Sequence, residues 1–198
     1  NLIGPTYIAE NPPNGSDISS CEYPPMEHVV GSEIYFLYVL ENIEENGWNA
    51  VNGIAAAVRA MRPNTPGSIN FIMSDGETVW AFRRGVDSLH RLFYLYNLAD
   101  RYAAVASHYP SASQGNWIEM LEYQLVVLHP GAAPIVINDV NTYCPGDINK
   151  DGLANATDLA AFAANFGLSG SGGDLDFDGD VDGTDVAALV AVYGQTCP

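Results

Sequence analysis

The strongest constraint on this chain is a twelve-residue pattern that occurs twice near its C-terminus. The two copies cover residues 147–158 and 174–185 and start 27 residues apart. In both copies, side chains with oxygen atoms stand at positions 1, 3, 5, 9 and 12, and glycine stands at position 6. Gly152 and Gly179 permit a sharp turn that other residues resist. The pattern therefore predicts an internal repeat of one structural unit.

The spacing of these oxygen atoms is that of a calcium-binding loop. Calcium takes about six to eight oxygen ligands in flexible geometry. We expect position 7 to offer its backbone carbonyl, position 9 to act through a water molecule, and position 12 to open a helix and supply a bidentate carboxylate. The alternative is an Asp/Gly-rich linker that binds no metal, but two copies in one register favour two Ca²⁺ sites. The predicted ligands are Asp147, Asn149, Asp151, Leu153, Asn155 and Asp158 in the first loop, and Asp174, Asp176, Asp178, Asp180, Asp182 and Asp185 in the second.

A short apolar segment follows each loop and ends in an aromatic residue and a glycine. Residues 158–167 and 185–194 align position by position. We expect each segment to form a helix that ends at Gly167 or Gly194, because glycine favours the left-handed conformation just beyond a helix. Apolar residues at helical spacing predict one buried face on each helix: Leu159, Phe162 and Phe166 on the first, and Val186, Leu189 and Tyr193 on the second.

This duplicated loop-and-helix layout, with aspartate at position 12 and a closing glycine, resembles a type I dockerin. The resemblance covers residues 145–194 and implies a module that binds two Ca²⁺ and docks onto a cohesin domain of another protein. Partner choice in that family depends on a Ser-Thr pair at loop positions 10 and 11. Those positions here are Ala156-Thr157 and Gly183-Thr184, so the resemblance implies calcium binding and leaves the partner open.

The negative charge is concentrated in the same region. The net charge of the chain is −17, and residues 144–198 contribute −8 of it, from nine aspartates and one lysine. Without cations these loops would repel themselves, so we expect metal binding and folding to be coupled. Seven basic residues in the whole chain disfavour nucleic-acid binding. No run of 18 apolar residues occurs, so no membrane span is predicted.

Two of the three cysteines bracket the repeat. A disulfide between Cys144 and Cys197 would close the module at its ends, and the chain-entropy model assigns it about 4 kcal/mol. Two free thiols are the alternative. The pairing leaves Cys21 free or in an intermolecular bond. A disulfide and aspartate-rich calcium loops both favour an exported protein in a calcium-rich extracellular or cell-surface setting.

The preceding residues predict an α+β domain over residues 31–140, after an extended, proline-rich segment over residues 1–30. Residues 144–198 are then predicted to form a small all-α module with paired EF-hand-like loops. In the α+β domain, two helices come first and an antiparallel run of strands follows, which is typical of a layered fold. We expect helices over 33–46 and 49–62, with an Asn49 cap, and strands over 68–74, 77–83, 92–96, 102–107, 123–129 and 135–137.

Part of this domain resembles a class II glutamine amidotransferase, a family with an N-terminal-nucleophile (Ntn) hydrolase fold. The matching residues are Gly31-Ser32-Glu33 before an apolar helix, the hairpin 69–83, residues 105–107, Trp117 and the closing strand 123–128. The resemblance covers residues 28–137. That family attacks glutamine with an N-terminal cysteine, whereas residue 1 here is asparagine, so the resemblance assigns no catalytic residue.

Two functions follow from these patterns. The favoured one is a non-enzymatic, bacterial-type exported protein whose calcium module connects it to a protein partner or to copies of itself in an extracellular or cell-surface assembly. The alternative is the C-terminal part of an amidotransferase-like amidohydrolase whose nucleophile-bearing half lies outside this chain. Whether the protein is an enzyme is thus open, and the lack of an N-terminal cysteine argues against it.

Overall fold

A computed structural model of the chain describes residues 31–61, 68–85, 90–109, 115–168 and 172–197. The predicted extended segment 1–30, with Cys21, lies outside these described residues, as does the expected end of the second helix at residue 62. The chain divides into two compact units, Asn1–Pro63 and Asn64–Pro198. The predicted domain division between residues 140 and 144 stays a prediction.

The first unit contains two helices that pack against each other, α2 (Gly31–Glu45) and α3 (Ala50–Met61). Gly47 turns the chain between them with a φ of 68°. Gly53 permits their close approach, because a Cβ atom at this position would lie 2.4 Å from Cα of Ile43. The buried face of α3 follows helical spacing and consists of Val51, Gly53, Ile54, Ala55, Ala57, Val58 and Met61.

Asn49 caps α3, as the sequence predicts. Its Oδ1 accepts a hydrogen bond from the backbone N–H of Asn52 at 2.9 Å, which satisfies one of the free donors at the helix start. We expect Asn49→Ala to lower the unfolding free energy by about 1 kcal/mol in urea denaturation. Asn49→Ser is the matched control, because serine also caps, and it should keep most of the stability. Equal losses in both variants would contradict the capping role.

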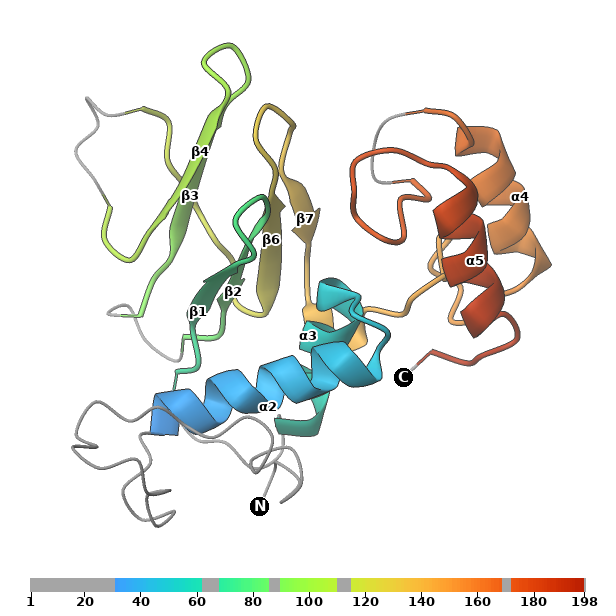
Figure 1. The fold of residues 1–198 in the computed structure, drawn as a ribbon, viewed down its shortest axis with the longest axis horizontal. Helices are drawn as coiled ribbons and strands as arrows, with labels where there is room; N and C mark the ends of the chain where they lie inside the picture. The colour runs from blue at the N-terminus through green and yellow to red at the C-terminus, as the bar shows by residue number, and fades with distance from the viewer. Residues whose placement is uncertain (1–30, 62–67, 86–89, 110–114, 169–171, 198) are drawn as a thin grey trace. The chain divides into compact units, whose positions relative to one another are not determined.

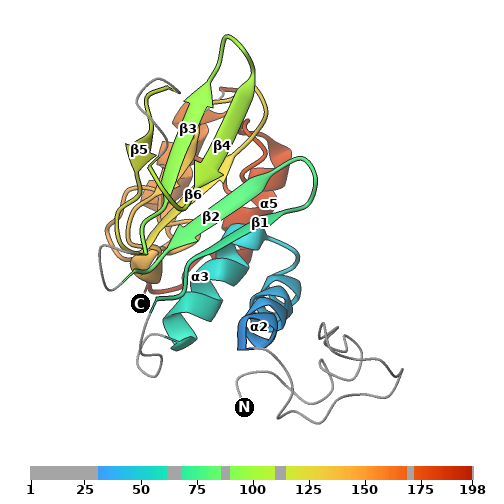
Figure 2. The ribbon, with the colours of Figure 1, turned by 90° about the vertical axis from the view of Figure 1, so that its left-hand side faces the viewer.

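The second unit begins with seven antiparallel strands in two sheets, counted over the described residues. One sheet has the order β1-β2-β6-β7, and the other has the order β4-β3-β5. Figure 2 shows β3 and β4 as a hairpin. The strands are β1 (Phe71–Ser74), β2 (Val79–Arg83), β3 (Phe93–Asn97), β4 (Tyr102–Ala106), β5 (Ile118–Glu119), β6 (Gln124–Leu128) and β7 (Ile135–Ile137).

The β1–β2 hairpin turns through residues 75–78, because Ser74 pairs with Val79. The turn lies where the sequence predicts it, but it is two residues longer than the predicted strands 68–74 and 77–83 allow. One carboxylate oxygen of Asp75 accepts hydrogen bonds from the N–H groups of Glu77 and Thr78 at 2.9 and 2.8 Å. These bonds, that of Thr78 first, hold the pKa of Asp75 below its usual value. Gly76 has a φ of 103°, which only glycine adopts easily. The turn is therefore fixed by local chemistry.

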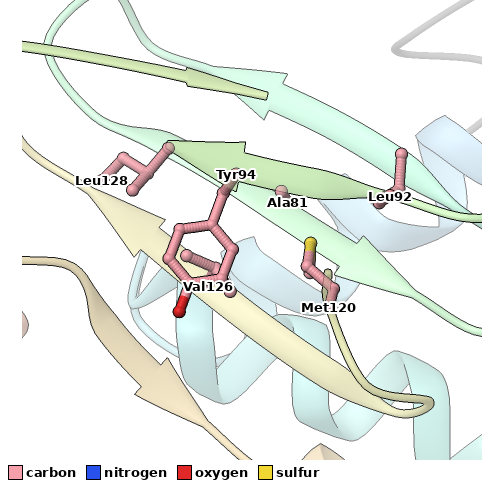
Figure 3. Close-up of a cluster of buried hydrophobic side chains, with 6 residues drawn as sticks. All are labelled: Ala81, Leu92, Tyr94, Met120, Val126 and Leu128. Carbon is pink, nitrogen blue, oxygen red and sulfur yellow. The ribbon is translucent and has the colours of Figure 1, made fainter. Parts of the chain in front are cut away.

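A shared apolar core lies between the two sheets (Figure 3). Ala81 and Val126 reach it from the first sheet, and Tyr94 reaches it from the second. Every residue of β6, which lies between β2 and β7 in its sheet, is buried. The helices and antiparallel sheets together form an α+β fold, as predicted. No helix in the described part of the chain is long and apolar enough to cross a membrane.

The C-terminal part contains a short 3₁₀-helix, η3 (Val140–Thr142), and then α4 (Ala156–Asn165) and α5 (Gly183–Val192). Phe162 of α4 and Leu189 of α5 meet in a small core, and Figure 1 shows the two helices side by side. The predicted apolar faces are only partly buried. Leu159, Phe166 and Tyr193 are each about half exposed, because this core is too small to cover two full helix faces.

Candidate metal sites

The first loop folds around the carboxylate of Asp147, the residue at position 1. Its Oδ1 accepts a hydrogen bond from the backbone N–H of Asp151 at 2.9 Å, and its Oδ2 accepts one from the N–H of Gly152 at 3.0 Å. Gly152 has a φ of 92°, in the region that favours glycine. Asp147 therefore draws positions 5 and 6 back toward position 1 and curls the loop.

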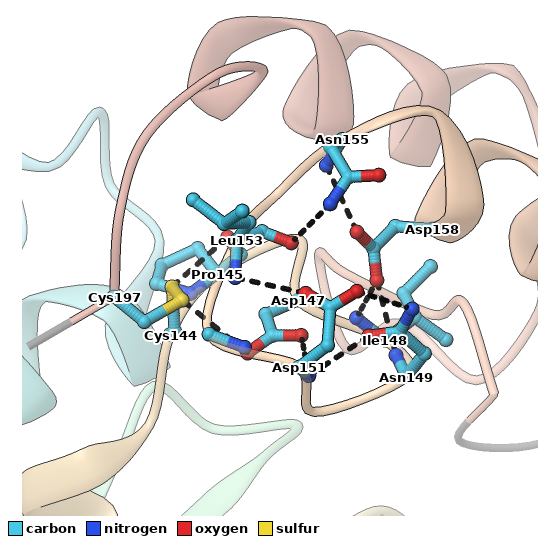
Figure 4. The surroundings of a disulfide bond; sticks show 11 residues. Cys144, Pro145, Asp147, Ile148, Asn149, Asp151, Leu153, Asn155, Asp158 and Cys197 are labelled. Atoms are coloured by element: carbon cyan, nitrogen blue, oxygen red, sulfur yellow. Dashed lines mark hydrogen bonds between the residues drawn. A yellow bond between two sulfur atoms is a disulfide. The ribbon is translucent and has the colours of Figure 1, made fainter.

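Asp158, at position 12, ties the end of the first loop to its beginning. Its side chain is fully buried. Its Oδ1 accepts hydrogen bonds from the N–H groups of Ile148 at 2.7 Å and Asn149 at 3.0 Å, and its Oδ2 accepts one from the N–H of Asn155 at 2.9 Å (Figure 4). The carboxylate is thus held in place by three backbone donors.

Helix α4 begins at Ala156, two residues earlier than predicted, because position 9 caps it. The Asn155 side chain accepts a hydrogen bond from the N–H of Thr157 at 2.8 Å, and Asp158 accepts from the N–H of Asn155 in return. This capping box satisfies two donors at the helix start. The same box, built on Asp182, starts α5. The prediction that position 12 opens the helix is therefore wrong, since position 12 is the third helical residue.

Inside the first loop, Asn149, Asp151 and Thr157 bind one another. The Asn149 amide nitrogen donates to Asp151 Oδ2 at 2.9 Å and to Thr157 Oγ1 at 2.7 Å. The Thr157 hydroxyl also donates to Asp151 Oδ2 at 3.2 Å. The Asn149 bond is the main reason why the pKa of Asp151 lies below its usual value. The position-7 carbonyl, that of Leu153, accepts a long bond of 3.4 Å from the side-chain amide of Asn155.

The second loop repeats the backbone frame of the first. Asp185 at position 12 is fully buried. Its Oδ1 accepts hydrogen bonds from the N–H groups of Leu175 and Asp176, and its Oδ2 accepts one from the N–H of Asp182 at 2.8 Å. These are the same three loop positions that bind Asp158 in the first loop. Two different sequences therefore build one loop shape.

The position-1 carboxylate of the second loop, Asp174, lacks one of its partners. Its Oδ2 accepts a hydrogen bond from the N–H of Gly179 at 3.2 Å, but its Oδ1 is buried and has no hydrogen-bond partner. Only 2% of this residue is exposed. Burial first, and then the neighbouring Asp185 charge, raise the pKa of Asp174 to about 6. A buried carboxylate oxygen without a donor is costly and is the environment that a bound cation relieves.

The other carboxylates of the second loop face one another. Burial is the main cause that raises the pKa of Asp176, and the nearby Asp178 is the main cause that raises the pKa of Asp180. A hydroxyl donor comes from Thr184, whose Oγ1 lies 2.6 Å from Asp176 Oδ2. The electrostatics of the loop therefore favour a positive ion.

Three groups of aspartates place carboxylate oxygens within 4.8 Å of one another and could hold a cation. Of the twelve predicted ligands, Asp178 is the one aspartate outside these groups. Asn149, Leu153 and Asn155 add amide or carbonyl oxygens to the first loop. The first loop has one group, which consists of Asp147, Asp151 and Asp158. The second loop has two groups that share Asp185: one adds Asp174 and Asp176, and the other adds Asp180 and Asp182.

A disulfide joins Cys144 to Cys197 and brings the C-terminus onto the first loop (Figure 4). The backbone N–H of Cys197 donates to the carbonyl of Gly152 at 3.0 Å, and Leu153 pairs with Thr196 in an antiparallel bridge. The Cys197 sulfur lies 3.3 Å from Oδ2 of Asp147. The disulfide and the bridge thus hold the chain end against positions 6 and 7 of this loop.

Each loop is also tied to the segment that follows the other loop's helix. Gly194, beyond α5, donates its N–H to the carbonyl of Ala154 in the first loop at 2.6 Å. Gly167, beyond α4, donates its N–H to the carbonyl of Val181 in the second loop at 2.8 Å. Both glycines have positive φ, as the predicted helix ends require. The two repeats therefore support each other reciprocally.

The threonine at position 11 has a role in both loops that was not predicted from the sequence. Thr157 contacts Asp151 in the first loop, and Thr184 contacts Asp176 in the second. Their hydroxyls also bind the capping side chains at position 9. The signal was present, because the same residue recurs at the same position of both copies.

Comparison with known proteins gives one partial structural match. No protein-family model matches the chain, and no curated protein matches it. A solved structure of a glutamine aminotransferase class-II domain protein from Silicibacter pomeroyi is similar, with a TM-score of 0.42 and 23% identity over 55% of this chain and 51% of that one. The chain thus spans about half the length of that protein. A likeness at this TM-score carries no conclusion about this chain, and the amidohydrolase alternative stays a prediction.

Proposed function

We propose that residues 144–198 form a dockerin-like module that binds two calcium ions, one in each loop. The ligands would be carboxylate, amide and carbonyl oxygens, which are the donors that calcium prefers. A carboxylate has about four lone-pair positions, so the oxygens of Asp158 and Asp185 that accept backbone N–H groups can still face a cation. In the first loop the ligands are Asp147, Asn149, Asp151, the Leu153 carbonyl, Asn155 and Asp158, and in the second they are Asp174, Asp176, Asp178, the Asp180 carbonyl, Asp182 and Asp185.

The observation that carries this proposal is the buried Asp174 Oδ1, which has no hydrogen-bond donor. The Asp174 carboxylate stands in a group with the carboxylates of Asp176 and Asp185. Like charges at this separation destabilise the loop unless a cation lies among them. The duplicated frame extends the proposal to the first loop, where Asp147, Asp151 and Asp158, at positions 1, 5 and 12, also form a group of three carboxylates.

The module would serve as a connector in an extracellular or cell-surface assembly. Large apolar side chains that are about half exposed or more on so small a unit favour contact with a protein partner or a second copy. A disulfide persists in an oxidising compartment, where calcium is also abundant. The apolar side chains are Leu159, Phe166, Leu168, Val190 and Tyr193.

Calcium stoichiometry tests the proposal directly. We expect two calcium ions per chain by elemental analysis after dialysis against calcium. Asp151→Ala should reduce this to one, because it removes a carboxylate from the first loop and breaks its bonds to Asn149 and Thr157. Glu122→Ala is the matched control, since it removes an exposed carboxylate outside both loops, and it should leave two ions bound. A wild-type chain without bound calcium would refute the proposal.

A further inference from the structure

The two loops share one backbone frame, yet their charges differ. The first loop, residues 147–158, holds three carboxylates and the ammonium group of Lys150. The second loop, residues 174–185, holds six carboxylates and no basic residue. Affinity in twelve-residue calcium loops depends on the number of ligand charges and on the rigidity of the site. Loops of equal shape and unequal charge should therefore differ in affinity.

The first loop satisfies its own polar groups without a metal. Both oxygens of Asp147 accept backbone N–H bonds. Oδ2 of Asp151 accepts from the Asn149 amide and from the Thr157 hydroxyl. An ion that binds Asp151 here has to compete with donors that are already in place. The hydrogen bonds within the first loop consequently stabilise its carboxylates even when no metal is bound.

The second loop has acceptors in excess of donors. Asp176 replaces Asn149 at position 3, so the side-chain amide that bridges the first loop is missing. Within the second loop, the N–H of Asp178 donates only to Asp176, at 3.3 Å, whereas the equivalent N–H of Asp151 in the first loop donates both to Asn149 and to Asp147, each at 2.9 Å. Oδ1 of Asp174 is left buried with no partner as a result. This unpartnered oxygen is a second sign, independent of the charge count, that the loop is built around a cation.

We propose that the two loops load in sequence, and that the second loop is the high-affinity site. This inference rests on the proposed calcium binding. The second loop fills first, because binding there relieves like-charge repulsion and supplies the buried Asp174 oxygen with a partner. The first loop fills at higher calcium concentration, because its ligands already bind one another. The module therefore passes through a half-loaded state in which the second loop is ordered by metal and the first is not.

A calcium titration of the full chain, followed loop by loop, tests this order. The backbone amides of Gly152 and Gly179 occupy position 6 of the first and second loops, so their NMR signals report each loop separately. Starting from metal-free protein, we expect the Gly179 signal to saturate at a free calcium concentration at least about tenfold lower than the Gly152 signal. Simultaneous saturation, or saturation of Gly152 first, would overturn the proposed order.

A pair of reciprocal substitutions identifies the cause of the difference. Asp176→Asn gives the second loop the position-3 residue of the first, and Asn149→Asp gives the first loop that of the second. We expect Asp176→Asn to weaken the tighter step about tenfold and Asn149→Asp to tighten the weaker step by a similar factor. Glu122→Gln, outside both loops, should change neither step.

The outcomes separate this inference from the proposed function. If neither amide signal responds to calcium, the proposed function fails. If both respond and the chain binds two ions with equal affinity, calcium binding stands and sequential loading fails. If the reciprocal substitutions leave both steps unchanged, the position-3 charge is not the cause of the order and the argument from ligand charge is refuted.

Discussion

Removal of calcium with EDTA should lower the thermal stability of this protein by a large margin. A calcium ion that binds the folded chain but not the unfolded chain stabilises the fold by about 2.7 kcal/mol per site when free calcium is about 100 times Kd. Two sites would then contribute about 5 kcal/mol, which corresponds to a shift of about 10 °C or more in Tm. The physical source is the second loop, where six aspartates and the unpartnered Asp174 oxygen lie together in the folded state.

The position of the tryptophans makes this experiment informative about the domains as well. Trp48, Trp80 and Trp117 all precede residue 144, so their fluorescence reports the α+β part of the chain. Circular dichroism at 222 nm includes α4 and α5. If the division between residues 140 and 144 is right, calcium should shift a helical transition and leave the tryptophan transition in place. If the second unit unfolds as one body, both probes should shift together.

The control for the melt is magnesium, which demands near-ideal octahedral geometry and gives up its water reluctantly. At equal concentration it should restore less of the lost stability than calcium does. Identical melting curves in calcium and in EDTA, with no metal found in the protein, would contradict the two calcium sites. Restoration by sodium chloride alone would indicate charge screening in place of specific binding.

Sequence reasoning succeeded where one local rule decides the structure. The place of the β1–β2 turn was predictable because Asp75 and Gly76 favour a turn through their own backbone geometry, although the loop extends to residue 78. The cap at Asn49 and the helix ends at Gly167 and Gly194 follow from local rules in the same way. Each of these features depends on a few neighbouring residues, so the sequence contains all the information that they need.

Several predictions failed where one residue could serve two roles or where distant residues decide the outcome. Position 9 could be a metal ligand or a helix cap, and its cap role moved the start of α4 to Ala156. Strand β5 was missed because two residues form no pattern of their own and pair only when β3 lies beside them. The half-exposed Leu159 and Tyr193 sit in apolar stripes whose burial depends on how large a core the rest of the module can offer.

The sequence predicted which residues form the candidate site, but it did not predict their burial or their hydrogen bonds. The repeat located the aspartates that form the groups around Asp158 and Asp185. It gave no sign that these two side chains are buried and bind three backbone N–H groups each. That arrangement arises only after the loop has closed, so spacing along the chain cannot show it.

Loss of the disulfide should be nearly as destabilising as loss of calcium. We expect the double variant Cys144→Ser/Cys197→Ser to lose about 4 kcal/mol of unfolding free energy in saturating calcium. The two cysteines are 53 residues apart, and the crosslink restricts the unfolded chain in proportion to the logarithm of that length. Urea denaturation measures the loss. Cys21→Ser is the matched control, because it removes a cysteine and leaves the disulfide intact, and its midpoint should stay at the wild-type value.

The same variant should affect the two loops unequally. The chain end that the disulfide holds pairs with the first loop, through Cys197 to Gly152 and Thr196 to Leu153. The second loop is tied instead to Gly167, which the disulfide does not hold. We therefore expect the Gly152 amide to need more calcium for saturation in the double variant, and the Gly179 amide to titrate as in the wild type. An equal change in both loops would show that the disulfide stabilises the module as a whole and gives the first loop no particular support.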